Sequence, residues 1–331
     1  MVLPQVEHLI PLKLIPMSIV RTFQLPASSD GLQLSVLQVL PTGVRFRGIL
    51  QLVHGMCEHK ARYLPFMQFM AQEGYACVLH DHRGHGTMAL EHGDLGYFHS
   101  GGWQAMVDDA LVVHRWIRDA LPQLPCHLLG HSMGSLVVRA LVKRHRLSLA
   151  SLTVCGSPSM HPSTPLAQCL ARLSIWLAGG HYRPQWLHAM SLGAFDRPFR
   201  HEGLPGAWIC SDPAIVEAYN KDPLCQFIVT ANGFYNLFAL MRYCYSPQQW
   251  QHVDANLPVH FISGADDPCR RNDRAFLHAV GLMKRVGYRR TDWKLFDGMR
   301  HEILNETDRL KVWNHILQTL QADSVIRGAM A

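Results

Sequence analysis

The segment CHLLGHSMGS, residues 126–135, joins a short apolar run to a helical stretch and contains the pattern Gly-x-Ser-x-Gly at residues 130–134. In this strand–turn–helix setting, the pattern predicts a sharp turn that presents Ser132 as a nucleophile. Both glycines have a physical reason, because side chains at positions 130 and 134 would collide with neighbouring backbone. The helix that follows favours negative charge at its N-terminus, beside the serine hydroxyl. The segment therefore predicts a reactive serine above a sheet of the α/β class.

On either side of this segment, short β-like runs alternate with longer helical stretches, which is typical of a mostly parallel sheet with helices on both faces. The pattern predicts eight strands, near residues 18–24, 32–39, 49–53, 75–80, 126–129, 151–155, 259–262 and 291–296. The predicted helices cover about residues 60–72, 103–120, 132–145, 271–285 and 302–321. The first two strands flank a turn-like stretch, so we expect them to form an antiparallel hairpin.

The interval from residue 158 to residue 256 interrupts this alternation, since roughly 100 residues separate two neighbouring strand candidates. It is rich in proline and contains several short helical patterns. One of them places apolar side chains on a single face: Leu166, Cys169, Leu170, Leu173 and Leu177. We interpret residues 158–256 as a helical cap inserted into one α/β core, which residues 1–157 and 257–331 form. The alternative is a long structural insertion without a role at the active site.

A nucleophilic serine needs a base within hydrogen-bond reach and a carboxylate that orients this base. In hydrolases with this turn, the acid and then the histidine follow the serine along the chain. Asp266 and Asp267 follow one predicted strand, and His301 follows the last one, so all three should lie at the same edge of the sheet as Ser132. Asp267 is favoured over Asp266, because the proline after it biases it towards an extended backbone.

This chemistry also requires two backbone N–H groups that bind the developing oxyanion. One should belong to Met133, directly after the serine. The other should belong to Met56, in the loop HGMCEH that follows the third predicted strand. The preceding Gly55 allows the backbone of this loop to approach the reacting atoms closely.

Two titratable residues adjoin these groups. His131 precedes Ser132, and neighbouring side chains on a sharp turn should point apart, so we expect His131 to pack rather than to act as the base. Glu58 lies in the oxyanion loop and could form an ion pair with Arg62 or Arg83; simple solvation of its carboxylate is an equal alternative.

Composition narrows the function classes further. The 331 residues include 31 Lys+Arg and 25 Asp+Glu, and the resulting charge of +6 is scattered, which argues against nucleic-acid binding. The nine cysteines are widely spaced without a CxxC pair, so we expect buried free thiols in a reducing compartment. His82 and His85 lack further ligands nearby, and no phosphate-binding glycine loop occurs. We therefore expect no metal and no cofactor.

The N-terminal residues do not form a convincing signal peptide, because Pro4, Pro11 and Pro16 interrupt them. No apolar run is long enough to span a membrane. These features lead us to expect a cytoplasmic protein.

Five motifs occur in order along the chain: HGMCEH (54–59), DHRGHG (81–86), GHSMG (130–134), GADDP (264–268) and RHEILNE (300–306). Together they resemble the monoacylglycerol lipase/lysophospholipase branch of the α/β-hydrolases, also described as serine aminopeptidase S33-like hydrolases. The resemblance extends over nearly the whole chain. It implies an α/β-hydrolase fold, a triad of Ser132, Asp267 and His301, oxyanion donors at Met56 and Met133, and a cap that lines an acyl-binding tunnel. One departure is Cys57, which replaces a small glycine common at this place in the family.

These observations predict a serine hydrolase that cleaves carboxylic esters with a hydrophobic acyl group, such as a monoacylglycerol or a lysophospholipid, through an acyl-enzyme. We expect Leu170, Trp176 and Leu177 of the cap to bind the substrate. The apolar cap also allows transient contact with a membrane surface.

Other activities could use the same triad, among them those of an aminopeptidase, a thioesterase or an acyltransferase. An aminopeptidase would need an acidic cluster that projects from the cap into the cleft, for which Asp212, Glu217 and Asp222 are the candidates. A non-catalytic binding protein with this fold is disfavoured, because all three types of triad residue are present.

Overall fold

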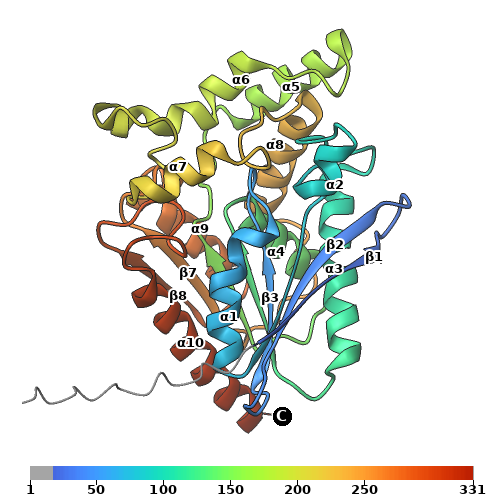
Figure 1. Cartoon of the computed structure of the whole chain (residues 1–331), viewed down its shortest axis with the longest axis vertical. Helices are drawn as coiled ribbons and strands as arrows, with labels where there is room; N and C mark the ends of the chain where they lie inside the picture. Colours follow the sequence, from blue (N-terminus) through green and yellow to red (C-terminus); the bar gives the residue numbers. More distant parts are fainter. Residues whose placement is uncertain (1–17, 331) are drawn as a thin grey trace, which may run out of the picture.

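The computed structural model describes residues 18–330, with side chains described up to residue 326. Within this range, the strands form one eight-stranded sheet in the order β1-β2-β4-β3-β5-β6-β7-β8 (Figure 1). The strands are β1 (Ile19–Pro26), β2 (Gln33–Leu40), β3 (Gly48–Val53), β4 (Tyr75–His80), β5 (Cys126–His131), β6 (Ser151–Cys155), β7 (Val259–Gly264) and β8 (Thr291–Phe296). The strand positions expected from the sequence are confirmed, with small shifts at the ends.

The pairing of the strands is mostly parallel. β1 and β2 form the predicted antiparallel hairpin, and β2 also pairs antiparallel with β4. The remaining neighbours pair parallel, including β6 with β7, which are distant in sequence. Because the carboxyl ends of parallel strands meet at one edge, the loops after β3, β5, β7 and β8 converge there.

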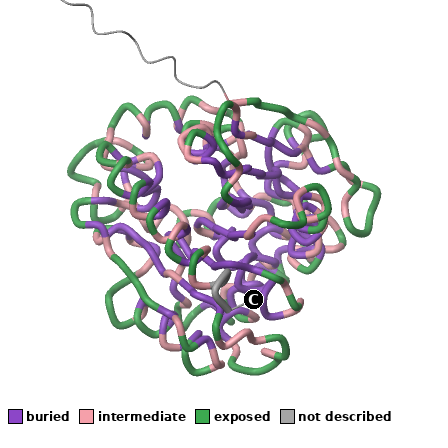
Figure 2. The backbone as a smooth tube through the Cα atoms, turned by 90° about the horizontal axis from the view of Figure 1, so that it is seen from below, coloured by how far each residue is buried: buried purple, intermediate pink, exposed green. Residues whose placement is uncertain are grey.

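The central strands are buried on both faces, which is why their sequences are mostly apolar and do not alternate between apolar and polar residues. Every residue of β3, β4, β5 and β6 is buried, whereas the edge strand β1 is largely exposed. Figure 2 shows this buried backbone in the middle of the molecule, surrounded by exposed loops and turns. Successive side chains point to opposite faces, so the neighbours Leu128 and Leu129 belong to two different apolar clusters.

Helices cover both faces of the sheet, as predicted. Outside the long insertion they are η1 (Lys60–Tyr63), α1 (Leu64–Gln72), α2 (Gly86–Glu91), α3 (Gly102–Ala120), α4 (Met133–Arg144), η3 (Pro268–Arg270), α9 (Asp273–Arg285) and α10 (Arg309–Met330). α1 and α10 share one apolar cluster through side chains such as Phe66 and Trp313. α3, α4 and α9 contribute to the cluster on the other face. The short helix α2 was not predicted; it begins at a glycine and has no side-chain cap that would signal it.

The last helix begins later than the sequence pattern predicts. α10 starts at Arg309, and residues 302–308 form turns instead. The backbone N–H of Glu302 donates to the carbonyl of Ile209 at 2.7 Å, so this segment binds the insertion rather than its own helix. Leu310, which the pattern placed on the apolar face, is 57% exposed. The apolar pattern begins several residues before the helix itself, because the turn residues Ile303 and Leu304 are also buried in the core.

The residues between β6 and β7, here called the inserted segment, fold as a series of helices over the carboxyl ends of the strands (Figure 1). They are α5 (Thr164–Ala178), α6 (Gln185–Met190), η2 (Leu192–Glu202), α7 (Pro213–Lys221) and α8 (Ala231–Tyr245). α8 is the most buried of them and joins the apolar cluster on the α4 side of the sheet through residues such as Phe234 and Leu240.

The orientation of α5 differs from the expected one. Its buried residues are small or polar, namely Thr164, Gln168, Ala171 and Ser174, and this side packs against α8. Gln168 Oε1 accepts a hydrogen bond from Arg242 on α8 at 2.6 Å. The apolar face that the sequence predicts, with Leu166, Leu173 and Leu177, is largely exposed to solvent. Small residues let the two helices approach closely, which leaves the large apolar side chains outside.

Among residues 18–330, no helix combines the length and the apolar character needed to cross a bilayer. All nine cysteines lie in this range and are free thiols, and all of them except Cys169 are buried. The prediction about a signal peptide concerns residues that lie outside the described part of the chain.

Candidate active site

Ser132 occupies the turn between β5 and α4, with φ +53° and ψ −120°. Residues other than glycine rarely adopt such a backbone, and holding one there costs about 1–3 kcal/mol. The flanking glycines allow neighbouring backbone segments to approach closely, as predicted. A Cβ atom on Gly134 would overlap the carbonyl oxygen of Val53, and a Cβ atom on Gly130 would overlap the carbonyl oxygen of Gly134. The Ser132 N–H donates to the carbonyl of Cys155 at 2.9 Å, which holds the strained turn against β6.

Of the two candidate acids, Asp267 is the one that contacts His301. Both of its carboxylate oxygens lie 3.0 Å from His301 Nδ1. Ser263 Oγ and the Cys269 N–H donate to the same carboxylate, at 2.9 Å and 2.8 Å. Burial by itself raises the pKa of the Asp267 carboxyl, but His301 and these hydrogen bonds outweigh it and lower the pKa below its ordinary value. Asp266, the competing candidate, is exposed.

His301 is buried, and its ring packs near those of His131 and Trp208, with centroid distances of 4.8 Å and 5.0 Å. Because Nδ1 faces Asp267, Nε2 is the nitrogen left to accept a proton. Ser132 and His301 line the same cavity. The three predicted triad residues therefore converge at one edge of the sheet.

This cavity has a volume of about 760 Å³ and lies between the sheet edge and the inserted segment. Its walls are mainly apolar side chains of the inserted segment, among them Leu166, Leu170, Leu187, Ile209, Leu237, Phe238 and Met241. The size and the apolar lining are those of a site for a small hydrophobic ligand.

The predicted substrate-binding residues divide into two groups. Leu170 lines the cavity, as expected. Trp176 and Leu177 do not line it, and they are 79% and 68% exposed on the outer side of α5. Their assignment is wrong, because the helix turns its small residues inward. Trp186 and Trp208, which the sequence did not single out, line the cavity instead.

The loop after β3 lies directly against the serine turn, since a Cβ on Gly55 would overlap Ser132 Cβ. Met56 in this loop and Met133 after the serine both line the cavity. Both residues predicted to supply the oxyanion donors therefore lie at the wall of the cavity that Ser132 also lines.

Buried histidines support this loop. The rings of His54, His82 and His85 lie 4.4–6.1 Å apart between centroids. His85 Nε2 accepts from the Cys57 N–H at 3.3 Å, and His54 Nε2 accepts from the His82 N–H at 3.0 Å. Burial lowers the pKa of His85 to about 4, which keeps this ring neutral. Cys57 has φ +56°, a conformation that favours glycine, so the hydrogen bond that its N–H donates to His85 stabilises a strained point of the loop.

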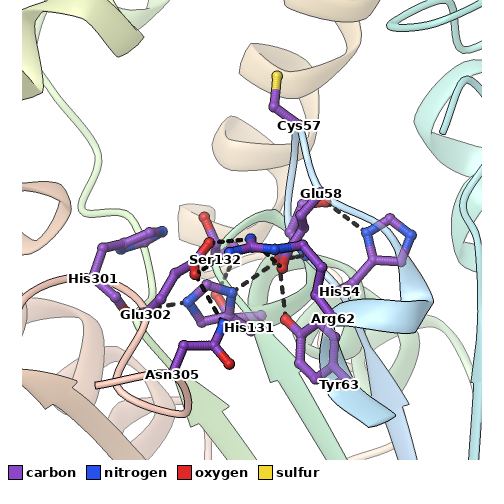
Figure 3. Close-up of polar contacts among 12 residues, drawn as sticks. His54, Cys57, Glu58, Arg62, Tyr63, His131, Ser132, His301, Glu302 and Asn305 are labelled. Carbon is purple, nitrogen blue, oxygen red and sulfur yellow. Dashed lines mark hydrogen bonds and ion pairs between the residues drawn. The ribbon is translucent and has the colours of Figure 1, made fainter. Parts of the chain in front are cut away.

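A polar network lies next to Ser132 (Figure 3), of which the sequence suggested only the pairing of Glu58 with an arginine. Glu58 accepts hydrogen bonds from the Gly55 N–H, from the Tyr63 hydroxyl at 3.0 Å and from His131 Nδ1 at 3.0 Å. On its other side, His131 Nε2 donates to the backbone carbonyl of His301 at 3.2 Å. One carboxylate and one imidazole thus connect the oxyanion loop, the serine turn and the loop that carries His301.

The network is charged. Burial raises the pKa of Glu58, but His131 and Arg62 outweigh it and lower this pKa to about 2. Burial lowers the pKa of His131, but Glu58 raises it above its ordinary value, consistent with an imidazolium that donates from both nitrogens. Arg62 lies 3.7 Å from Glu58 and also binds Glu302. Of the two arginines considered from the sequence, Arg62 is therefore the partner of Glu58, and Arg83 pairs with other carboxylates. His131 has an ionic role beyond the expected packing.

The chain matches the family model described as serine aminopeptidase, S33, over residues 45–308. It is 25% identical over 274 residues to a protein named monoacylglycerol lipase from Mycolicibacterium smegmatis, covering 82% of this chain and 86% of that relative. It is 24% identical over 266 residues to a protein named phospholipase YtpA from Bacillus subtilis, covering 80% of this chain and 92% of that relative. A thermostable carboxyl esterase from Bacillus coagulans has the same fold, with a TM-score of 0.85 at 24% identity, over 92% of this chain and 99% of that one. The chain belongs to the serine aminopeptidase S33 family of α/β-hydrolases.

Proposed function

We propose that this protein is a serine hydrolase that cleaves carboxylic esters with a hydrophobic acyl group, using Ser132, His301 and Asp267. The observation that carries the proposal is the buried contact between the Asp267 carboxylate and His301 Nδ1, at the wall of a cavity that Ser132 also lines. Relatives named monoacylglycerol lipase and phospholipase support an ester lipid as the substrate.

In the proposed reaction, His301 Nε2 takes the proton from the Ser132 hydroxyl as the oxygen attacks the ester carbonyl. Asp267 holds the required tautomer and stabilises the imidazolium that forms. The backbone N–H groups of Met56 and Met133 bind the oxyanion, and one such donor is typically worth about 100- to 1,000-fold in turnover. The imidazolium then protonates the leaving alcohol. A water molecule, activated by the same imidazole, releases the acid from the acyl-enzyme.

The inserted segment has the role of a cap in this proposal, with residues 158–256 placed over the core. Its apolar residues supply most of the cavity wall, which suits an acyl chain and excludes water from the reacting groups. Leu170 is the predicted cap residue that supports this role, since it lines the cavity.

The positions of the acidic residues favour an ester over a peptide substrate. Asp212 caps α7, Asp222 binds His59, and Glu217 pairs with Lys221 on the surface. None of these three described acids lines the cavity, so they do not form there the cluster expected for recognition of a peptide amino group. The acids that do line it already have partners: Asp196 accepts from the Gly206 N–H, Glu58 binds His131, and Glu302 binds Arg62. Thioesterase and acyltransferase activities use the same triad and are separated from ester hydrolysis by direct comparison of rates.

The test is the Ser132→Ala variant, assayed on p-nitrophenyl esters of increasing acyl length beside an acyl-thioester and an aminoacyl amide. We expect the wild-type protein to prefer the esters and the variant to lose turnover and labelling by a fluorophosphonate probe. Full activity in the variant would refute the assignment of the nucleophile. A wild-type preference for the amide would refute the substrate class.

The exposed apolar side of the inserted segment supports a second part of the proposal, contact with a membrane surface. Large side chains that are more than two-fifths exposed gather on α5 and α6: Leu166, Leu173, Trp176, Leu177, Trp186 and Met190. We call this set the outer apolar face. Leu166, Trp186 and Met190 also line the cavity, so the face adjoins the site where a lipid would enter.

Co-sedimentation with phosphatidylcholine vesicles tests this contact. The double variant Trp176→Ser/Leu177→Ser should bind vesicles at least about fivefold more weakly, given the apolar area it removes. Val325→Ser is the matched control, because Val325 is 74% exposed on α10 at the opposite end of the molecule (Figure 1). Equal binding by the double variant and the control would exclude the outer apolar face as the contact.

A further inference from the structure

A cluster of side chains suited to a metal ion lies where the inserted segment meets the core, outside the proposed triad. His59 is the last residue of the oxyanion loop HGMCEH (54–59), whereas Asp222 and Cys225 belong to the connection between α7 and α8. A ring nitrogen, a carboxylate oxygen and the sulfur of these residues lie within 4.8 Å of one another. Imidazole, carboxylate and thiolate are the three kinds of ligand that zinc uses in proteins.

The local backbone presents two of the ligands from a single turn. The Cys225 N–H donates to the carbonyl of Asp222 at 3.0 Å, and the Leu224 N–H donates to Asp222 Oδ1 at 2.8 Å. Asp222 Oδ2 is thereby directed to His59 Nε2, at 2.8 Å. A tetrahedral ion with bonds near 2.0–2.1 Å holds such atoms roughly 3.3 Å apart, so this pair needs to open by about half an ångström. The thiol has to move further, towards the ion.

The ion pairs around this point leave the Asp222 carboxylate for the cluster. Glu58 pairs with His131 and Arg62, and Arg62 also binds Glu302. Asp222 pairs instead with the His59 imidazole. A divalent ion held by these two side chains places its positive charge beside the Asp222 carboxylate, and it releases the thiol proton of Cys225 to solvent as the thiolate bond forms.

An ion can reach the cluster from two sides. The side chains of His59 and Asp222 are 12% and 29% exposed. Cys225 lines the large cavity. A second set with metal-binding atoms at similar spacing, Asp267, Cys269 and His301, is fully buried and contains the triad acid and base, so the experiment has to separate the two sets.

We propose that His59, Asp222 and Cys225 bind one divalent cation of the zinc class, which joins the turn between α7 and α8 to the loop that follows the oxyanion donors. The fourth ligand is water. The ion connects the inserted segment to the core at the rim of the cavity, so its binding stabilises the position of this segment.

The experiment uses the full chain, stripped with a chelator and dialysed against buffered Zn²⁺, with bound metal measured by elemental analysis. Co²⁺ in place of Zn²⁺ reports a thiolate ligand through a sulfur-to-cobalt absorption band. We expect about one equivalent per chain together with this band. Cys225→Ala and Asp222→Asn should each weaken binding at least tenfold, since the loss of an outer-shell partner alone costs 10–100-fold. Zn²⁺ should raise the Tm of the wild-type protein more than that of either variant.

The controls are Cys269→Ala, which removes the thiol of the second set, and Cys169→Ala, which removes the exposed thiol. Both should bind Zn²⁺ as the wild-type protein does. Wild-type affinity in Cys225→Ala and Asp222→Asn, or loss of binding in Cys269→Ala, would overturn the proposal, the latter by placing the ion at the triad. Thermal unfolding without metal shows whether each variant is folded, and the partly exposed Asp222 provides a test that does not depend on a buried substitution.

Discussion

The two sides of the large cavity are built in different ways. We call the polar network of Glu58, His131, Arg62 and Tyr63 its floor, and the inserted segment between β6 and β7 its roof. Below Ser132, buried polar groups bind one another, and Glu58 alone accepts from a backbone amide, a tyrosine and His131. Above it, small buried residues of α5 such as Ala171 lie on the side that packs against α8, and large apolar side chains of the inserted segment face the cavity or the solvent. Lys143 and Arg300 of the core bind the inserted segment through its backbone carbonyls, those of Tyr243 and Ala207. The floor thus fixes directions of individual atoms, and the roof supplies an apolar surface.

This difference has an energetic consequence. A buried charge that loses its partner is expensive, because it keeps its desolvation cost without the compensating attraction. An exposed apolar side chain that is shortened loses little, because water already surrounds it. Substitutions in the floor should therefore impair chemistry and stability strongly, and substitutions on the outside of the roof should leave the fold nearly unchanged.

The largest effect is expected from Asp267→Asn. The amide cannot hold His301 in the tautomer that accepts the serine proton, so we expect kcat for a p-nitrophenyl ester to fall about 10⁴-fold. Asp266→Asn is the matched control, since Asp266 is exposed, and its kcat should stay within about twofold of the wild-type value. The opposite ranking of the two variants would assign the acid to Asp266 and contradict the geometry at His301.

The floor itself is tested by Glu58→Gln. This change leaves the His131 imidazolium buried without its counterion, and we expect a loss of about 3–5 kcal/mol in the free energy of unfolding, measured by denaturant titration. Asp308→Asn breaks an exposed pair with Lys311 and should cost at most about 0.5 kcal/mol. The double variant Glu58→Gln/His131→Gln removes both charges and should regain part of the loss. A single variant as stable as the control would mean that His131 is neutral.

The pH dependence of the free energy of unfolding gives a further test of the ion pair between Glu58 and His131. The partners of Glu58 lower its pKa to about 2, from an ordinary value of 4.5. A depressed acid pKa contributes stability that is complete above pH 4.5 and is lost as the pH falls towards 2. The loss is about 3 kcal/mol over this window. Other carboxylates also destabilise both proteins when they are protonated at low pH. The quantity to measure is therefore the difference in the free energy of unfolding between the wild-type protein and Glu58→Gln at each pH. This difference should shrink as the pH falls, and a constant difference would contradict the assignment.

The site around Ser132 and the inserted segment also differ in how much of their structure can be predicted from the sequence. The proposed triad of Ser132, Asp267 and His301 could be predicted from short motifs at strand ends, because the chemistry of a serine hydrolase needs these residue types in a fixed order. The ionic role of His131 does not follow from the sequence, since Glu58 lies 73 residues away along the chain and only the fold brings the two side chains together. The start of α10 was misplaced for a similar reason, as the turn residues before it obtain their partners from the distant inserted segment.

For α5, the sequence correctly predicts a helix with one apolar face. The expectation that this apolar face is buried is wrong, because the opposite face is the buried one. Periodicity states which residues share a face, and the usual assumption is that the apolar face is buried. Here the opposite face, with Ala171 and Ser174, packs on α8, because small side chains permit a close approach of two helices. The exposed large residues then remain available for other contacts. Sequence spacing alone does not choose between these arrangements, since α5 has a single charged side chain, Arg172, which is exposed beside Leu173.

The smallest expected effect comes from a pair of substitutions on the two faces of α5. Ala171 is fully buried, and Ala171→Leu inserts a large side chain between α5 and α8, which should cost about 1–3 kcal/mol in the free energy of unfolding. Leu173 is 48% exposed on the outer face, and Leu173→Ala should change this free energy by less than about 0.5 kcal/mol. Denaturant titration of both variants measures the difference. If Leu173→Ala were the more harmful change, its side chain would be buried in the folded protein, and α5 would pack through the face that its apolar spacing first suggested.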